Sequence, residues 1–218
     1  MKNFYFFLSL LTIAGNLFAQ KEAVNDPEAK KILDAVSAKF KTYKSVQASF
    51  TYKVENADGK AISTKKGMVY MKGAKYRVSF VGQEIYCDGT TVWTYDKSSN
   101  EVTITKLDIS NNTITPQKLL TDFYDKDFLY KLNGESKIAG RKIQEIEMTP
   151  NDKKKLFHKV YLMIDKKAKT IYSTKVLEKE GNRYSYTVNT LTGNVDIADS
   201  KFVFDKKDYP DVEEVDLR

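Results

Sequence analysis

The sequence predicts a mostly β protein, an incomplete antiparallel β-barrel of about 11–12 strands with an α-helical lid over a hydrophobic cavity. Three observations predict this fold. Apolar and polar residues alternate in short segments from position 46 onward, Asp-Gly and Asn-Gly pairs separate several of these segments, and only two segments have helical spacing. A twisted sheet of so many strands must curl or split, which places its apolar side inside the curl. Alternation fits both a partly empty interior and one filled by side chains.

The first 19 residues have the pattern of a secretory signal peptide. A charged start at Met1-Lys2-Asn3 precedes an apolar run from Phe4 to Phe18, which ends at Ala19. The run is shorter than the roughly 20 residues that span a membrane, and no second run of that length follows. We therefore expect cleavage after Ala19 and export. Residues 20–218 contain no repeat or low-complexity linker, which predicts a single domain.

Two amphipathic helices are predicted. The first covers residues 27–41, because Asp26 supplies an N-cap acceptor, Pro27 fits the first helical position and Glu28 faces the positive end of the helix dipole. Its apolar face consists of Ala29, Ile32, Leu33, Val36 and Phe40. A shorter helix opens at Thr115-Pro116 and carries Leu119, Leu120, Phe123 and Tyr124. Each apolar face must cover another part of the protein.

Strands are predicted on both sides of the second helix. On the first strand, Val46, Ala48 and Phe50 alternate with Gln47 and Ser49, so the two sets face opposite sides of the sheet. Before the second helix we expect strands at 46–54, 67–72, 76–81, 84–87, 91–95 and 102–107, and after it at 128–132, 136–138, 143–148, 159–164, 170–177, 183–191 and 202–204. Asn133-Gly134 is predicted as one of the connecting turns.

Composition argues against nucleic acid as a partner. The formal net charge is +7, but the lysines stand mostly at predicted turns, arginines are few, and export removes the usual target. Solvated turn lysines are therefore the simpler interpretation, alongside a mild attraction to anionic lipid head groups.

The sequence offers little that could do chemistry. His158 is the only histidine and Cys87 the only cysteine, so neither belongs to a motif for a metal ion or a nucleophile. Cys87 is expected to be a small buried strand residue and His158 a solvated one. Two carboxylates distant in the chain could still converge as in a glycosidase, but we expect no enzyme, no cofactor and no metal.

Several ordered segments resemble the LolA family of periplasmic lipoprotein carriers. They are residues 46–54, 67–72 and 88–95, then the strand that ends in Thr149-Pro150, and finally residues 195–204, which look like the last strand of that family. The resemblance covers nearly the whole chain after the signal peptide. It implies a periplasmic monomer that takes acylated lipoproteins from an ATP-driven transporter of the inner membrane and gives them to an acceptor at the outer membrane.

The same resemblance implies which residues line the lipid-binding cavity. Each of them could instead be an ordinary core residue, and this holds especially for Trp93, a lone tryptophan in a β protein. The predicted lining residues are Val36, Phe40, Phe50, Tyr70, Tyr76, Val78, Phe80, Trp93, Leu119, Leu120 and Phe123.

One departure from the family concerns the latch that holds the lid. Members of the family carry an arginine in the loop after the strand corresponding to 67–72, whereas this chain has Lys72-Gly73-Ala74-Lys75. Lys72 and Lys75 are the candidate substitutes, and Arg77 lies nearby in a predicted strand. A carrier of another amphiphile, such as a glycolipid, and a sensor or scaffold that binds no lipid are therefore alternative functions.

Overall fold

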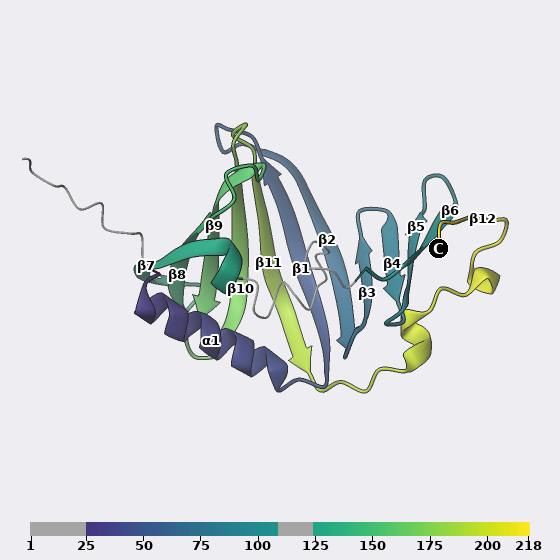
Figure 1. Cartoon of the computed structure of the whole chain (residues 1–218), viewed down its shortest axis with the longest axis horizontal. Helices are drawn as coiled ribbons and strands as arrows, with labels where there is room; N and C mark the ends of the chain where they lie inside the picture. Colours follow the sequence, from purple (N-terminus) through teal and green to yellow (C-terminus); the bar gives the residue numbers. More distant parts are fainter. Residues whose placement is uncertain (1–24, 109–123) are drawn as a thin grey trace, which may run out of the picture.

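A single open sheet of twelve strands dominates the computed structural model, which describes residues 25–108 and 124–218 (Figure 1). Neighbouring strands are antiparallel except β12 and β6, which are parallel. The predicted mostly β, unclosed antiparallel fold is thus confirmed. In the order in which they lie side by side, the strands are β12 (Glu213–Asp216), β6 (Glu101–Lys106), β5 (Thr91–Asp96), β4 (Gln83–Cys87), β3 (Lys75–Phe80), β2 (Ala61–Lys72), β1 (Ser45–Glu55), β11 (Arg183–Gly193), β10 (Thr170–Glu178), β9 (Phe157–Asp165), β8 (Arg141–Pro150) and β7 (Phe128–Ile138).

Three predicted elements differ from the structure. The strands expected at 128–132 and 136–138 form one strand, β7, because a bulge between Leu132 and Gly134 absorbs the predicted turn. The strand expected at 202–204 is wrong, since Asp199–Phe202 forms a 3₁₀ helix, η2, and a second one, η3, covers Lys206–Asp208. The short strand β12 was not predicted.

Some predictions lie outside the described residues. These are the signal peptide over 1–19 and most of the second helix, including Leu119, Leu120 and Phe123. The structure describes the adjoining helix α2 (Tyr124–Asp127). Among the described helices, none has the length and apolar character to span a membrane.

The sheet has two faces that different segments cover. We call the face that carries α1 (Pro27–Lys41) the inner face and the opposite one the outer face. Val46 and Ala48 of β1 point to the inner face, where they pack in a cluster that Phe40 and Tyr43 also join. Successive strand residues point to opposite faces, so the register assigns a face to every other strand residue.

Helix α1 is tied to the sheet at its first turn. The Asp26 carboxylate accepts hydrogen bonds from the backbone N–H of Glu28 at 2.8 Å and of Ala29 at 3.4 Å. Its other oxygen accepts from the backbone N–H of Leu132 in β7 at 2.9 Å. From this anchor α1 crosses one end of the neighbouring strands (Figure 1), and the side chains it buries are Ala29, Leu33, Val36 and Ser37.

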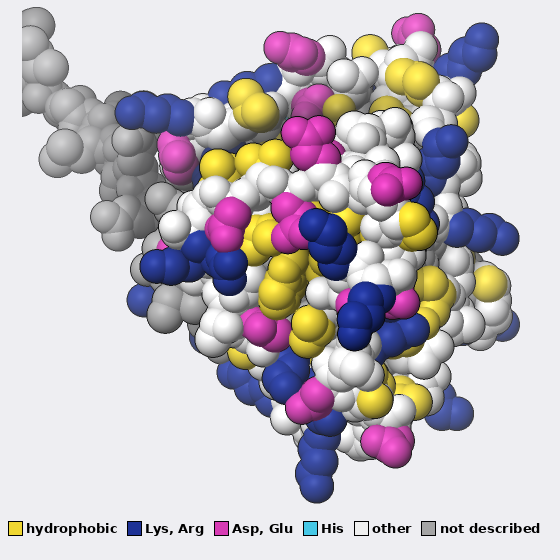
Figure 2. Space-filling view, turned by 90° about the vertical axis from the view of Figure 1, so that its right-hand side faces the viewer, with side chains coloured by type: hydrophobic (Ala, Val, Ile, Leu, Met, Phe, Trp, Pro, Cys, Tyr) yellow, Lys and Arg dark blue, Asp and Glu magenta, His cyan; other side chains and the backbone are white. Residues whose placement is uncertain are grey.

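The C-terminal segment after β11 covers part of the outer face. Phe204 and Val212 pack there against a cluster formed by Tyr86, Tyr95, Val102 and Ile104. Figure 2 views the molecule from the side on which this segment lies, and hydrophobic side chains there alternate with charges of both signs. This surface therefore presents no single-sign field of the kind that nucleic acid binds.

Replacing Asp26 with Ala should destabilise the protein by about 2–3 kcal/mol, since it removes a helix cap and leaves the Leu132 N–H without its acceptor. Asp26→Asn keeps an acceptor for the helix but loses one of the two oxygens, so its cost should be intermediate. Denaturant unfolding followed by circular dichroism measures both values. Equal stability of the Ala variant and the parent would contradict this role.

Candidate functional site

The inner face has two parts that differ in how tightly they are packed. Over β7 to β10, α1 packs against a continuous cluster of fully or nearly fully buried side chains. Over β1 to β5, Val46, Met71, Tyr76 and Cys87 form a second buried cluster. Farther along β1, toward the ends of β1, β3 and β10, the inner face carries large aromatic rings that are only partly buried.

These rings belong to Phe50 and Tyr52 of β1, Phe80 of β3, and Tyr184 and Tyr186 of β11, and we call them the inner aromatic group. Their centroids form a connected set: Phe50 to Phe80 is 5.6 Å, Tyr52 to Phe80 is 5.1 Å and Tyr52 to Tyr186 is 4.9 Å. Tyr184 stacks on Tyr52 at 6.0 Å. Such spacing is typical of favourable aromatic pairs.

Part of this group is open to solvent and none of it carries charge at neutral pH. Tyr186 is 41% exposed, a large fraction for an aromatic residue on the inner side of a curved sheet. Burial, together with the neighbouring Tyr186, Tyr184 and Glu178, raises the pKa of Tyr52 to about 12. Burial also raises the pKa of Tyr184 and Tyr186. The group thus offers a neutral, mainly apolar surface with phenol hydroxyls at its border.

Gly67 makes room for this group. The ring of Phe50 lies directly over it, so a Cβ at position 67 would come within 2.3 Å of the Phe50 Cζ atom. Gly67 is paired with Phe50 in β1 and with Phe80 in β3, which brings the two rings together across a strand that has no side chain at that position.

Six of the predicted lining residues lie on the inner face. Val36 and Tyr76 are buried in the two packed clusters, and Phe40 and Val78 pack against the second cluster. Phe50 and Phe80 belong to the inner aromatic group. Their role in binding a ligand stays a prediction.

Two predicted lining residues point the other way. Tyr70 pairs with Arg77, and its ring lies under Lys201, whose Nζ is 4.8 Å from the ring centroid. Trp93 pairs with Tyr86 and packs in the outer cluster under the C-terminal segment. The prediction that both residues line one interior with Tyr76 is therefore wrong. Directly paired residues of neighbouring strands share a face, so the face of Trp93 depends on the exact register of each hairpin between β2 and β5.

Three residues of the inner aromatic group, Tyr52, Tyr184 and Tyr186, are not among the predicted lining residues. All three point to the inner face. Tyr52 is two residues from Phe50 on the same strand, and β11 pairs Tyr186 with Tyr52 and Tyr184 with Val54. What the sequence did not supply was the pairing of β1 with β11, two segments that lie far apart in the chain.

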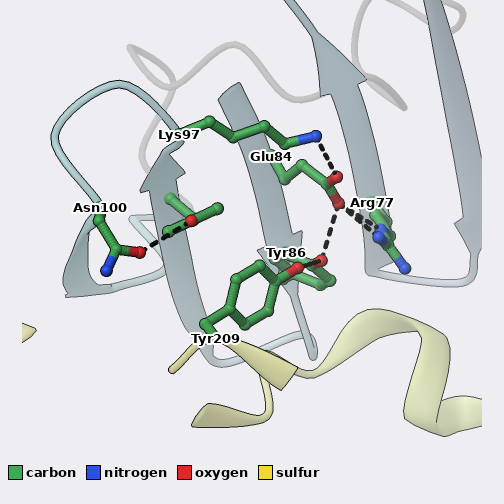
Figure 3. Close-up of polar contacts among 7 residues, drawn as sticks. Arg77, Glu84, Tyr86, Lys97, Asn100 and Tyr209 are labelled. Atoms are coloured by element: carbon green, nitrogen blue, oxygen red, sulfur yellow. Dashed lines mark hydrogen bonds and ion pairs between the residues drawn. The ribbon is translucent and has the colours of Figure 1, made fainter. Parts of the chain in front are cut away.

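A buried carboxylate organises the outer face beneath the C-terminal segment (Figure 3). Glu84 is 8% exposed, accepts hydrogen bonds from Arg77 Nε at 3.1 Å and Tyr86 at 2.8 Å, and pairs with Lys97 at 2.9 Å. The Tyr86 hydroxyl also meets the Tyr209 hydroxyl at 2.6 Å. The C-terminal segment is thereby hydrogen-bonded to a charged network in the sheet.

Burial alone would favour the neutral form of Glu84. Hydrogen bonds from Lys97, Arg77 and Tyr86 outweigh that effect and lower the pKa of the carboxyl to about 2. The same burial, with the Tyr209 and Glu84 hydrogen bonds, raises the pKa of Tyr86 far above its usual range. Glu84 is therefore a charged structural acceptor at neutral pH.

The candidate latch lysines also hold the C-terminal segment. Lys72 Nζ lies 2.9 Å from Asp199 Oδ1 and donates to the Ile197 carbonyl oxygen at 2.9 Å. Lys75 donates to the other oxygen of Asp199 at 2.7 Å. These contacts lower the pKa of Asp199 to about 2, with the Lys75 hydrogen bond as the largest cause. Both lysines thus bind η2, whereas Arg77 donates a hydrogen bond to Glu84.

The described residues contain no cluster of histidine, cysteine and carboxylate side chains suited to a metal ion. His158 is exposed, as expected. Cys87 is fully buried next to Tyr76, and this burial raises the pKa of its thiol.

The open sheet, with a helix on one face and a half-exposed apolar group beside it, defines a half-barrel protein with an apolar inner surface. The family model described as "Outer membrane lipoprotein carrier protein LolA" matches residues 41–205. This chain belongs to the LolA family.

Individual relatives are distant. An outer-membrane lipoprotein carrier protein of Pseudomonas putida is 27% identical over 170 residues, which are 74% of this chain and 77% of that protein. An uncharacterized protein of Methanocaldococcus jannaschii is 26% identical over 205 residues, which are 92% of this chain but only 57% of that protein. The crystal structure of an uncharacterized conserved protein from Thermus thermophilus superposes with a TM-score of 0.59 at 15% identity, over 87% of this chain and 99% of that one.

Replacing Glu84 with Gln should lower the free energy of unfolding by about 2 kcal/mol at neutral pH, because it removes a charged acceptor from a buried network. The pH dependence should change as well. The folded-state pKa of Glu84 is lowered from 4.5 to about 2, so its stabilisation is complete above about pH 4.5 and disappears as the pH falls to about 2. The variant should lose that part of the slope in acid unfolding curves. Glu135→Gln, which alters an exposed carboxylate paired with lysines, is the matched control and should change the free energy of unfolding much less.

Gly67→Ala should destabilise the protein by about 1–2 kcal/mol, because the new Cβ forces the Phe50 ring to move. In a Phe50→Ala background the same change should cost little, since the ring is absent. A double-mutant cycle of unfolding free energies measures this coupling. Additive effects would show that the two residues do not restrain each other.

Proposed function

We propose that this protein is a carrier that binds acyl chains on its inner face and moves them across the periplasm. In this proposal residues 1–19 direct export and residues 20–218 work as one domain, a monomer that performs no catalysis. Membership of the LolA family and the name of the Pseudomonas putida relative support the proposal.

The inner aromatic group is the observation that carries the proposal. It is neutral, mainly apolar and partly open, although it stands beside two clusters that are fully packed. Each methylene moved from water to such a surface contributes about 0.8 kcal/mol, so an acyl chain can bind tightly through many small contacts. Partial exposure also suits a carrier, because a bound chain must be able to leave.

Acylated lipoproteins are the cargo that we favour, with an ATP-driven transporter of the inner membrane as donor and an acceptor at the outer membrane. A second candidate cargo is another amphiphile, such as a glycolipid. The tyrosine hydroxyls of the inner aromatic group favour this alternative, because Tyr52, Tyr184 and Tyr186 can donate to the polar part of a lipid.

Replacing Phe80 with Glu should reduce the affinity for a fluorescent fatty acid by more than tenfold, because a carboxylate would stand among the rings that contact the chain. Phe40→Glu tests the other part of the inner face and should also weaken binding. Val203→Glu is the matched control, since Val203 is an exposed apolar residue of the C-terminal segment, and it should bind within twofold of the parent. Unchanged affinity in a folded Phe80→Glu variant would contradict binding at this face.

The cargo itself is identified by native mass spectrometry of protein purified without detergent from its own periplasm. An adduct with the mass of an acylated polypeptide supports the lipoprotein carrier, and a small-lipid adduct supports the amphiphile carrier. A bare protein that also fails to bind the fatty acid would point to the scaffold that binds no lipid.

A further inference from the structure

The loop between β8 and β9 combines cationic and apolar side chains in full exposure. Its six residues, 151–156, are all exposed, and Leu156 is 78% exposed, the largest value among the exposed hydrophobic residues of the described chain. Lys153, Lys154 and Lys155 directly precede it. An isolated exposed leucine is common on protein surfaces, but here it stands next to three consecutive lysines, which supply the positive charge that anionic lipid attracts.

The loop holds a defined shape through its backbone. The Asp152 carboxylate accepts from the Lys154 backbone N–H at 2.8 Å, and the Lys179 backbone N–H donates to the Leu156 carbonyl oxygen at 3.0 Å. Lys179 Nζ also donates to the Lys153 carbonyl oxygen at 2.5 Å. Lys153, Lys154 and Lys155 are all exposed, and among the described residues none of their ammonium groups pairs with a carboxylate.

The loop lies at the border of the inner face. The next residue, Phe157, packs against the cluster beneath α1, and its ring stacks on that of Phe128 with centroids 6.2 Å apart. Leu156 therefore stands one residue outside the apolar interior. The loop lies at the end of the strands at which β1 and β10 end and β11 begins. The inner aromatic group lies near that same end.

We propose that loop 151–156 docks the protein onto a membrane surface rich in anionic phospholipid, with Leu156 entering the interface and the three lysines facing lipid phosphates. This inference rests on the proposed function, since it places the apolar inner face next to the bilayer from which or to which acyl chains move. Each lysine near an anionic membrane surface raises the affinity about fivefold. Three lysines therefore give weak, reversible binding, which suits a protein that travels between membranes.

The test is sedimentation of the purified exported protein with vesicles of phosphatidylglycerol and phosphatidylethanolamine in equal parts, at low salt. The triple variant Lys153→Gln, Lys154→Gln, Lys155→Gln should bind these vesicles at least tenfold more weakly. Leu156→Ser should bind about three- to tenfold more weakly, and at this exposure it should not affect folding. Raising the salt to about 0.5 M should release the parent protein, because the attraction is screened.

Matched controls change the same chemistry elsewhere. The control triple variant removes three exposed lysines at the opposite ends of the strands: Lys137→Gln, Lys167→Gln and Lys169→Gln. A second control, Leu217→Ser, removes an exposed leucine of the C-terminal segment. Both should bind vesicles within twofold of the parent. If the control triple variant lost as much vesicle binding as the loop variant, the net charge of the protein would explain the effect, and the proposal would be overturned.

Fatty-acid binding in solution separates this proposal from the proposed function. The loop variants should bind the fluorescent fatty acid as the parent does, since no residue of the inner aromatic group is changed. Normal fatty-acid binding with no vesicle binding by the parent would overturn the docking proposal alone. Full vesicle binding by the triple variant, with loss of cargo exchange, would assign the loop to an acidic protein partner and would also overturn it.

Discussion

The register of the central strand β1 is the constraint on which the rest of the structure depends. Its hydrogen bonds to β2 and β11 decide that Val46 and Ala48 face α1 and that Gln47 and Ser49 face the other side. A slip of one residue would exchange these sets and place polar groups against the helix. Because paired residues of neighbouring strands share a face, the two clusters of the inner face and the outer cluster that includes Phe204 all follow from this register.

Much of this arrangement could be predicted from local sequence. The helix over 27–41 and most strands follow from capping residues and alternation, and the turn residues Gly59 and Gly89 have the positive φ values that such turns require. Alternation also explains what failed. Phe202 and Phe204 stand two positions apart, as apolar residues on one face of a strand do, yet Phe202 ends a 3₁₀ helix and neither residue belongs to a strand. The strand β12 is short and acidic, so only its tertiary contact with β6 makes it a strand. The face of Trp93 depends on the register of three successive hairpins, which no single segment reveals.

The division of the inner face links packing to function. Where α1 covers the sheet, side chains such as Ile146 and Met148 are fully buried, and the core can resist rearrangement. The inner aromatic group is held differently, by rings that contact one another above Gly67 and keep some exposure. The C-terminal segment meanwhile packs on the opposite face of the sheet, where Tyr86 hydrogen-bonds to both Glu84 and Tyr209.

An unclosed sheet has two outermost strands, here β12 and β7, whose free backbone groups can recruit another chain. On one side the outermost strand is only the short, acidic β12, and on the other side residues 25–26 bond to part of β7. The backbone of β6 is paired by β12, with further bonds from the Glu213 N–H to the Asn100 carbonyl oxygen and from the Leu217 N–H to that of Ile104. On β7, the Tyr130 and Leu132 N–H groups donate to Asn25 and Asp26, and the Tyr130 carbonyl oxygen accepts from the Asp26 N–H. Two short segments thus discourage polymerisation through strand addition. If the protein works as the monomer proposed above, this protection of the strand backbones is what lets a half-barrel keep an apolar inner face exposed without joining neighbouring copies sheet to sheet.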